Sequence, residues 1–80
     1  MRRINNVDEL RESLESGHTE FVVCLNFGAI SRKSIFPRED GGFSVFYGID
    51  GTFRHMSAEE LRSEDIIGKA MAAGAFFEDE

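Results

Sequence analysis

Residues 43–56 read FSVFYGIDGTFRHM, and this stretch decides the fold. Apolar and polar side chains alternate on both sides of Asp50-Gly51, and an Asp-Gly pair between two such runs is a strong signal for a β-hairpin with a two-residue turn. The pattern predicts strands over residues 43–49 and 52–56. The predicted register pairs Ile49 with Thr52, Gly48 with Phe53, Tyr47 with Arg54, Phe46 with His55 and Val45 with Met56.

This register gives the hairpin two unequal faces, because successive side chains of a strand point to opposite sides of the sheet. The face predicted to join the core carries Phe43, Val45, Tyr47, Ile49 and Met56, together with Thr52 and Arg54. The opposite face carries Ser44, Phe46, Gly48, Phe53 and His55. On that face, Phe46 and Phe53 are predicted either to form a contact patch for a partner or to lie beneath the first helix or Phe76–Phe77.

The segment before the hairpin begins with a predicted helix over residues 7–16. Asn6 is expected to cap it, with Glu9 completing a capping box, and Gly17 is expected to end it. One apolar stripe along this helix consists of Ile4, Val7, Leu10 and Leu14.

Two further strands are predicted between this helix and the hairpin. Residues 19–27 alternate well, and the side chains expected on one face are Phe21, Val23, Leu25 and Phe27. Residues 31–36 are shorter and more polar, and Pro37 cannot donate to a ladder, so this strand is expected at an edge or to end at a bend. Residues 38–42 are typical of a turn.

After the hairpin, Ser57 and Glu60 form a second predicted capping box. The helix that follows is expected to pause near Ser63, which is a candidate cap for a second helical segment. Its apolar side consists of Leu61, Ile67, Ala70 and Met71, and Gly74 is expected to close it. Residues 75–77 are predicted to form either a final strand or a hydrophobic latch. The predicted fold class is α+β: a helix, a four-stranded antiparallel meander and a C-terminal helix.

Length and composition limit the function classes. Eighty residues suit one small domain over 1–80 with an acidic tail at 78–80, and 41% hydrophobic residues are typical of a globular chain. A single cysteine makes no internal disulfide, and no apolar run approaches the ~20 residues of a membrane span, so a cytoplasmic protein without membrane contact is expected.

Catalytic and metal-binding patterns are weak in this sequence. The spacing of Cys24, His18 and His55 matches neither a cysteine–histidine dyad nor a zinc site, so no catalytic residue, cofactor or metal is predicted. A small enzyme built on Cys24 or His55 is the least favoured alternative.

The basic residues suggest a different alternative. Arg32, Lys33 and Arg38 could contact phosphate, which would suit a nucleic-acid-binding regulator. A net charge of −6 opposes general nucleic-acid binding, however. The preferred interpretation is therefore that Arg32 and Lys33 are charges on an edge strand that discourage aggregation.

The acidic residues gather in the C-terminal half, at Glu59, Glu60, Glu64 and Asp65 and again at 78–80. They are predicted either to form one acidic surface that docks on a basic partner or to be a solvated helix face. The predicted partner-binding residues are Glu59, Glu60, Glu64, Asp65, Phe46, Phe53 and His55. The partner is expected to be a protein rather than a nucleic acid, and the chain itself a monomer or weak homodimer.

In size, acidity and predicted architecture, the whole chain resembles the small anti-CRISPR proteins carried by phages and mobile elements. No motif supports this resemblance residue by residue. It implies a non-catalytic inhibitor that binds a CRISPR effector, often over the basic surface that holds nucleic acid.

Overall fold

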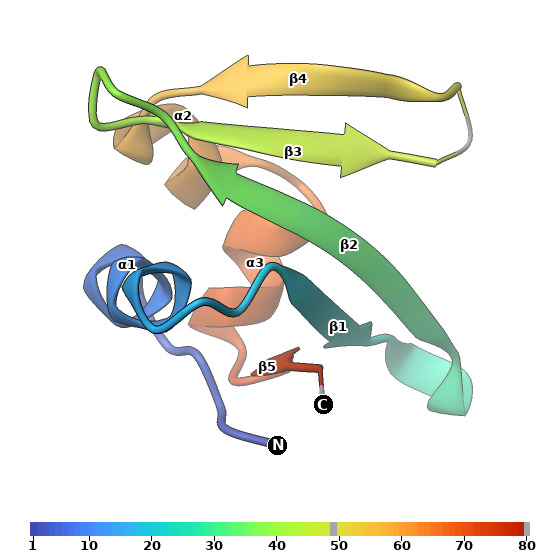
Figure 1. Ribbon diagram of the computed structural model, residues 1–80. Helices are drawn as coiled ribbons and strands as arrows, with labels where there is room; N and C mark the ends of the chain where they lie inside the picture. The colour runs from blue at the N-terminus through green and yellow to red at the C-terminus, as the bar shows by residue number, and fades with distance from the viewer. Residues whose placement is uncertain (49, 80) are drawn as a thin grey trace.

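One antiparallel sheet organises the chain, and the helices pack on a single face of it (Figure 1). The computed structural model describes residues 1–48 and 50–79, apart from the side chain of Phe27. Within these residues the elements are α1 (Val7–Glu15), β1 (Glu20–Cys24), the 3₁₀ turn η1 (Asn26–Gly28), β2 (Ile30–Pro37), β3 (Phe43–Tyr47), β4 (Thr52–Met56), α2 (Ala58–Ser63), α3 (Ile67–Ala72) and β5 (Phe76–Glu78). The predicted α+β class is confirmed.

The strand order in the sheet is β4-β3-β2-β1-β5. Strands β1 to β4 form the predicted antiparallel meander. From the β4 edge, α2 and α3 carry the chain across the sheet, so that β5 pairs with β1 at the opposite edge. The final segment is therefore a strand and not a latch.

Helix α1 begins and ends at residues identified in the sequence. The Oδ1 atom of Asn6 accepts from the amide of Glu9 at 2.9 Å, but the Glu9 carboxylate reaches the amide of Asn5 and not that of Asn6, so the predicted capping box is incomplete. Gly17 adopts a φ of 98°, and the amides of Gly17 and His18 bond the carbonyls of Leu14 and Ser13. This is a Schellman motif, in which left-handed backbone ends the helix.

Strand β1 is shorter than predicted, because it stops at Cys24 instead of reaching Phe27. The amide of Leu25 bonds the carbonyl of Ala29, and Gly28 takes a φ of 76°. This tight reversal lets β2 pair with β1 at once, and it leaves Leu25 outside the strand and 46% exposed.

Of the two alternatives for this strand, the edge position is wrong, because β2 is the central strand and the longest one described. The other alternative holds, since β2 ends at Pro37 directly before the turn. Pro37 is its last residue, opposite Phe43, where the missing donor affects only the end of the ladder. Arg32 and Lys33 are therefore not edge charges, and the preferred explanation of them is wrong too.

The hairpin turn also differs from the prediction. Tyr47 pairs with Thr52, so four residues connect the strands and the register moves by two positions. The amide of Gly51 bonds the Tyr47 carbonyl, while Asp50 Oδ1 accepts from the amide and hydroxyl of Thr52. These bonds close the loop at the pair Tyr47–Thr52 and not at the predicted pair Ile49–Thr52. Because the shift is even, both predicted faces survive among the described residues, and Gly51 has a positive φ of 68°.

The second helical region divides where the sequence suggested. The capping box of Ser57 and Glu60 is present, and α2 ends at Ser63. Ser63 is not the cap of α3, since its hydroxyl donates back to carbonyls of α2. The N-cap of α3 is Ile66, and the Glu64 carboxylate accepts from the amides of Ile66 and Ile67 at this helix start.

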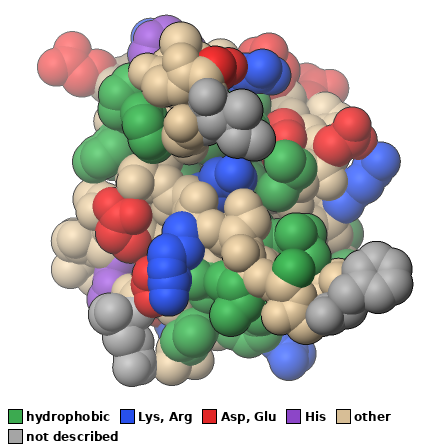
Figure 2. Space-filling model, turned by 90° about the vertical axis from the view of Figure 1, so that its right-hand side faces the viewer, with side chains coloured by type: hydrophobic (Ala, Val, Ile, Leu, Met, Phe, Trp, Pro, Cys, Tyr) green, Lys and Arg blue, Asp and Glu red, His purple; other side chains and the backbone are tan. Residues whose placement is uncertain are grey.

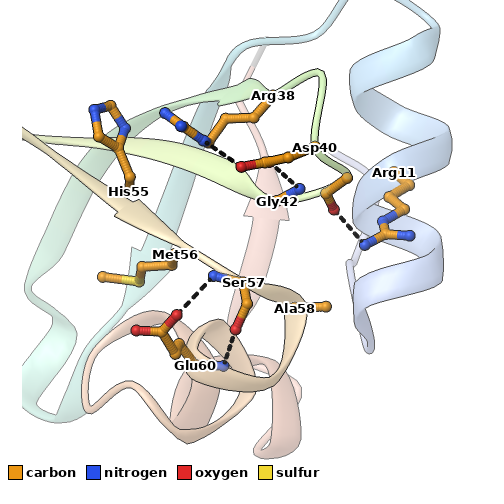
Figure 3. A pocket seen from close by; sticks show the side chains of 10 residues that line it. Arg11, Arg38, Asp40, Gly42, His55, Met56, Ser57, Ala58 and Glu60 are labelled. Carbon is orange, nitrogen blue, oxygen red and sulfur yellow. Dashed lines mark hydrogen bonds and ion pairs between the residues drawn. The ribbon is translucent and has the colours of Figure 1, made fainter.

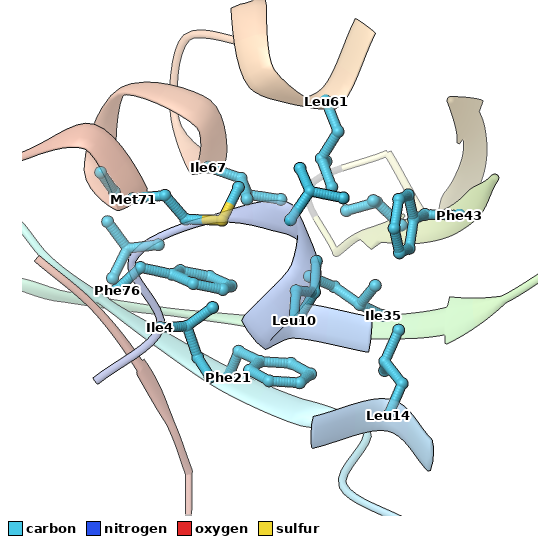
Figure 4. Close-up of a cluster of buried hydrophobic side chains, with 14 residues drawn as sticks. Ile4, Leu10, Leu14, Phe21, Ile35, Phe43, Leu61, Ile67, Met71 and Phe76 are labelled. Atoms are coloured by element: carbon cyan, nitrogen blue, oxygen red, sulfur yellow. The ribbon is translucent and has the colours of Figure 1, made fainter. Parts of the chain in front are cut away.

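The core lies between the sheet and the helices (Figure 4). Phe21 of β1 and Phe76 of β5 stack with centroids 5.4 Å apart, and Leu10 and Ile35 pack beside them. All four residues predicted for the apolar side of the second helix are buried, as are the four of the α1 stripe. The description of residues 78–80 as a tail is wrong for Glu78, which belongs to β5 and is 5% exposed.

Candidate functional site

The outer face of the sheet, opposite the helices, carries a row of aromatic side chains. Phe36 of β2, Phe46 of β3 and Phe53 of β4 form what we call the phenylalanine cluster, with centroids 5.2 Å apart for Phe46–Phe53 and 6.0 Å apart for Phe36–Phe53. Phe53 is 50% exposed and Phe36 is 38% exposed. Neither α1 nor Phe76 covers them, because both pack on the other face, and Phe77 lies on β5 at the sheet edge opposite β4. Of the two alternatives, the structure shows the open patch.

Phe36 is the member of this cluster that sequence reasoning missed. The interpretation of residues 31–36 as an edge strand hid the place of Phe36 in the sheet. In the observed register Phe36 is opposite Ser44, and this pairing places its ring on the same face as Phe46. The available signal was the alternation of Ser34 and Phe36 with buried Ile35.

Polar groups adjoin the phenylalanine cluster at one end. Ser44 Oγ and His55 Nδ1 lie 2.9 Å apart, and Arg38 donates to Ser44 at 3.4 Å. Arg38 also pairs with Asp40 at 3.4 Å, and the pKa of Asp40 is lowered first by the amide of Gly42 and further by Arg38. Figure 3 shows the adjoining cleft of about 360 Å³, which the Arg38–Asp40 pair and the Ser57–Glu60 capping box help to line.

The Ser44–His55 pair has the spacing of a nucleophile and its base but, among the described residues, not the third group of a catalytic triad. A nucleophilic serine needs a histidine base that a third group orients and stabilises when it is protonated. Among the described residues, no third group bonds the other ring nitrogen of His55, and Arg38 donates to Ser44 and not to the histidine. Ser44 and His55 thus form a hydrogen bond at the rim of the phenylalanine cluster.

The other predicted chemical residues lie apart. Cys24 ends β1, His55 lies on β4 three strands away, and His18 pairs with Glu78 at 2.9 Å. Within residues 1–48 and 50–79, no group of three or more histidine, cysteine or acidic side chains is placed to hold a metal ion.

The proposed basic patch is not assembled either. Neighbouring strand residues point to opposite faces, so Arg32 reaches Asp79 at 3.3 Å on the outer side while Lys33 is buried on the inner side. Arg38 lies six residues after Arg32, which is roughly 20 Å at the usual strand rise. No single phosphate-binding surface results from the three.

The acidic residues have local structural roles. Glu60 belongs to the capping box of α2, Glu64 is half-buried and accepts from the first amides of α3, and Asp65 pairs with Lys69 at 2.8 Å. The hydrogen bond and charge of Lys69 lower the pKa of Asp65. Glu59 is exposed. Glu78 lies in β5, at the sheet edge opposite β4, so it does not extend an acidic surface on α2.

Comparisons with family models, curated proteins and solved structures found no match to this chain. In the part of the chain that the structure describes, no helix has the length and apolar character needed to cross a bilayer. The fold and the site together define a small α+β domain with an open aromatic sheet face.

Proposed function

We propose that this protein is a small non-catalytic binding module of the cytoplasm that docks on another protein through the phenylalanine cluster. The observation that carries the proposal is three contacting phenylalanine rings on a sheet face that no helix covers. Exposed aromatic clusters of this kind mark protein-binding surfaces, and aromatic residues contribute strongly to binding at interface centres.

The size of the cluster is sufficient for useful affinity. A phenylalanine buries roughly 150–250 Å² in full. Covering the exposed half of Phe53 would remove about 100 Å² from water, which is worth about 2–3 kcal/mol. Phe36 and the accessible part of Phe46 would add to this.

The edge of the sheet beside Phe53 supports the same proposal. The N-terminal segment covers the outer edge of β5. The amide of Ile4 donates to the carbonyl of Phe76, and the amide of Glu78 donates to the carbonyl of Arg2, both at 2.8 Å. Within the described residues no segment pairs with the outer edge of β4, and β4 contains no proline, glycine or acidic residue. An extended segment of a partner can therefore add to β4 and cover Phe53.

Charge selects the kind of partner in this proposal. The net charge of −6 attracts a basic protein surface at long range, and the phenylalanine cluster supplies contact at short range. A basic surface that normally holds nucleic acid would fit both requirements. The more specific expectation of a CRISPR effector as the target stays a prediction.

A differential capture experiment tests the proposal. Tagged wild-type protein would be compared in the native host with a Phe36→Ser, Phe53→Ser variant and with a Leu25→Ser control. Leu25 is similarly exposed but follows β1, outside the phenylalanine cluster. A partner that the double variant loses and the control retains is the expected result, with purified components confirming direct binding. Equal recovery by all three proteins would exclude the cluster as the docking site.

A further inference from the structure

Strand β4 is a sheet edge with little of the protection that open edges usually have. It is the uppermost strand in Figure 1, and no described segment pairs with its outer side. Its five residues pair with β3 without a bulge, and they include no lysine and no proline. The guanidinium of Arg54 lies 4.7 Å from the centroid of the Tyr47 ring on β3, so it is held over its own sheet and not across the edge. This edge is therefore open to another strand.

A symmetric pairing of two copies through β4 restricts the register. Two-fold symmetry makes the two β4 strands antiparallel, about an axis perpendicular to the sheet, and leaves the helices of both copies on the same side of the joined sheet. Residues opposite each other then belong to the same face, because side chains alternate along each strand. The registers that keep most of the strand paired are centred on Phe53, Arg54 or His55.

Charge and packing favour the register centred on Phe53. A register centred on Arg54 would set the two guanidinium groups directly opposite each other, which destabilises a strand pair. A register centred on His55 would set Phe53 opposite Ser57, whose amide already donates to the Glu60 carboxylate in the capping box of α2. The register centred on Phe53 avoids both conflicts.

This register makes the edge complementary to itself on both faces. On the outer face, the two Phe53 rings meet at the axis and join the phenylalanine clusters of the two copies into one row. On the inner face, Arg54 lies opposite Thr52 of the second copy. The Thr52 hydroxyl donates to Asp50 at 2.6 Å, so a carboxylate lies beside each incoming guanidinium. Apolar contact and opposite charges therefore meet at the same edge.

We propose that this protein forms a symmetric dimer in which β4 pairs antiparallel with β4 of a second copy, in the register centred on Phe53. The two five-stranded sheets then become one continuous sheet with a shared aromatic outer face. The dimer uses the same edge as the proposed docking of another protein, but it does not require that protein. A second copy and an extended segment of a partner would compete for β4.

Interface size and net charge set the strength of this dimer. Pairing over the five residues of β4 lies below the roughly 1,200 Å² of standard interfaces, so we expect a Kd in the micromolar range or weaker. Each copy carries a net charge of −6, so repulsion opposes dimerisation at low salt. Figure 2 views the molecule from the side of the β3–β4 loop, where hydrophobic side chains lie together at the upper left and acidic and basic ones are interspersed. Charges of both signs on this side limit the repulsion to long range.

Sedimentation equilibrium of the purified protein tests the proposal. The concentrations run from about 10 μM to about 1 mM, which brackets a weak dimer, at low and high sodium chloride. A reducing agent keeps the exposed Cys24 from cross-linking the copies. We expect the dimer fraction to rise with concentration and with salt. A monomer at every concentration and salt would overturn the dimer without bearing on docking, which the capture experiment tests.

Variants at position 52 test the register. Thr52→Glu sets a carboxylate opposite Arg54 of the second copy, and Thr52→Lys sets a cation there. Both lose the same hydroxyl bond to Asp50, so each controls for the other. At high salt, the Glu variant should dimerise about tenfold more tightly than the Lys variant, because the contact occurs twice in the dimer. Equal Kd values for the two variants, both folded by circular dichroism, would overturn the register.

A second pair of variants tests the surface itself. Phe53→Ser removes the ring at the axis and should weaken dimerisation about tenfold or more, because aromatic side chains at an interface centre contribute most of the binding. Leu25→Ser is the matched control, since Leu25 is 46% exposed and lies outside β4. It should dimerise as wild type does. Equal weakening in both variants, or in neither, would show that the copies do not meet at β4.

Discussion

At the scale of single residues, the closest backbone approach occurs at Gly68. A β-carbon there would collide with the backbone carbonyl oxygens of Leu61 and Arg62, because α3 starts directly against the end of α2. Gly68→Ala should lower the free energy of unfolding by about 2–4 kcal/mol, since the clash is with backbone and not with a flexible side chain. Urea denaturation measures this. Gly48→Ala is the control, because its β-carbon would make only an ordinary contact with Phe46.

Asp50 gives a residue-scale prediction about pH. Its hydrogen bonds to Thr52 hold its pKa below the ordinary 3.8 in the folded protein. The stability that this carboxylate contributes is therefore present above pH 3.8 and is lost as the pH falls through the lower folded pKa. We expect wild type to exceed Asp50→Ala in melting temperature at pH 6 and the gap to narrow below about pH 3.8. A gap independent of pH would contradict this.

At the scale of elements, the hairpin loop depends on Gly51. Its φ of 68° lies in the left-handed region, where β-branched side chains are strained, and its amide bonds the carbonyl of Tyr47. Gly51→Val should destabilise the protein by more than about 1 kcal/mol, as measured by thermal or chemical unfolding. An unchanged melting temperature would mean that the loop can adopt another conformation at no cost.

Strand β5 is predicted to be essential although it is short. Phe76 is fully buried against Phe21, so Phe76→Ala should cost about 3–5 kcal/mol, which is comparable to the whole stability of a domain this small. We expect this variant to be largely unfolded by circular dichroism at 25 °C. Phe77→Ala, on the other face of the same strand and only half-buried, should remain folded. Equal stability of the two variants would show that β5 contributes little to the core.

At the scale of the whole molecule, net charge should control how fast a basic partner binds. Glu15, Glu39 and Glu59 are exposed and have no structural partner among the described residues, so changing all three to Gln raises the net charge from −6 to −3 without removing a cap. With the captured partner, association should slow at low salt and converge with wild type at high salt. Stopped-flow or surface-based kinetics would measure these association rates. Equal rates for the variant and wild type at low salt would exclude electrostatic steering of the partner.

The local features of this protein were determined by its sequence. Asn6, Gly17, Ser57 and Gly74 bound the helices because capping and left-handed backbone depend on a few neighbouring atoms. The two faces of the hairpin also follow from alternation alone, and they survived a wrong turn because the register shift was even. Phe46 and Phe53 could therefore be named as a candidate patch from the sequence.

Only the tertiary structure decided where those elements lie and which side chains meet. The central place of β2 depends on pairing with β1 and β3 together, which no single segment specifies, and that place adds Phe36 to the phenylalanine cluster. The same packing separates Arg32 from Lys33 and moves Glu78 away from α2. It also buries Lys33 beside Tyr47. Contacts between residues distant in the chain set all of these positions, and those contacts are non-local by nature.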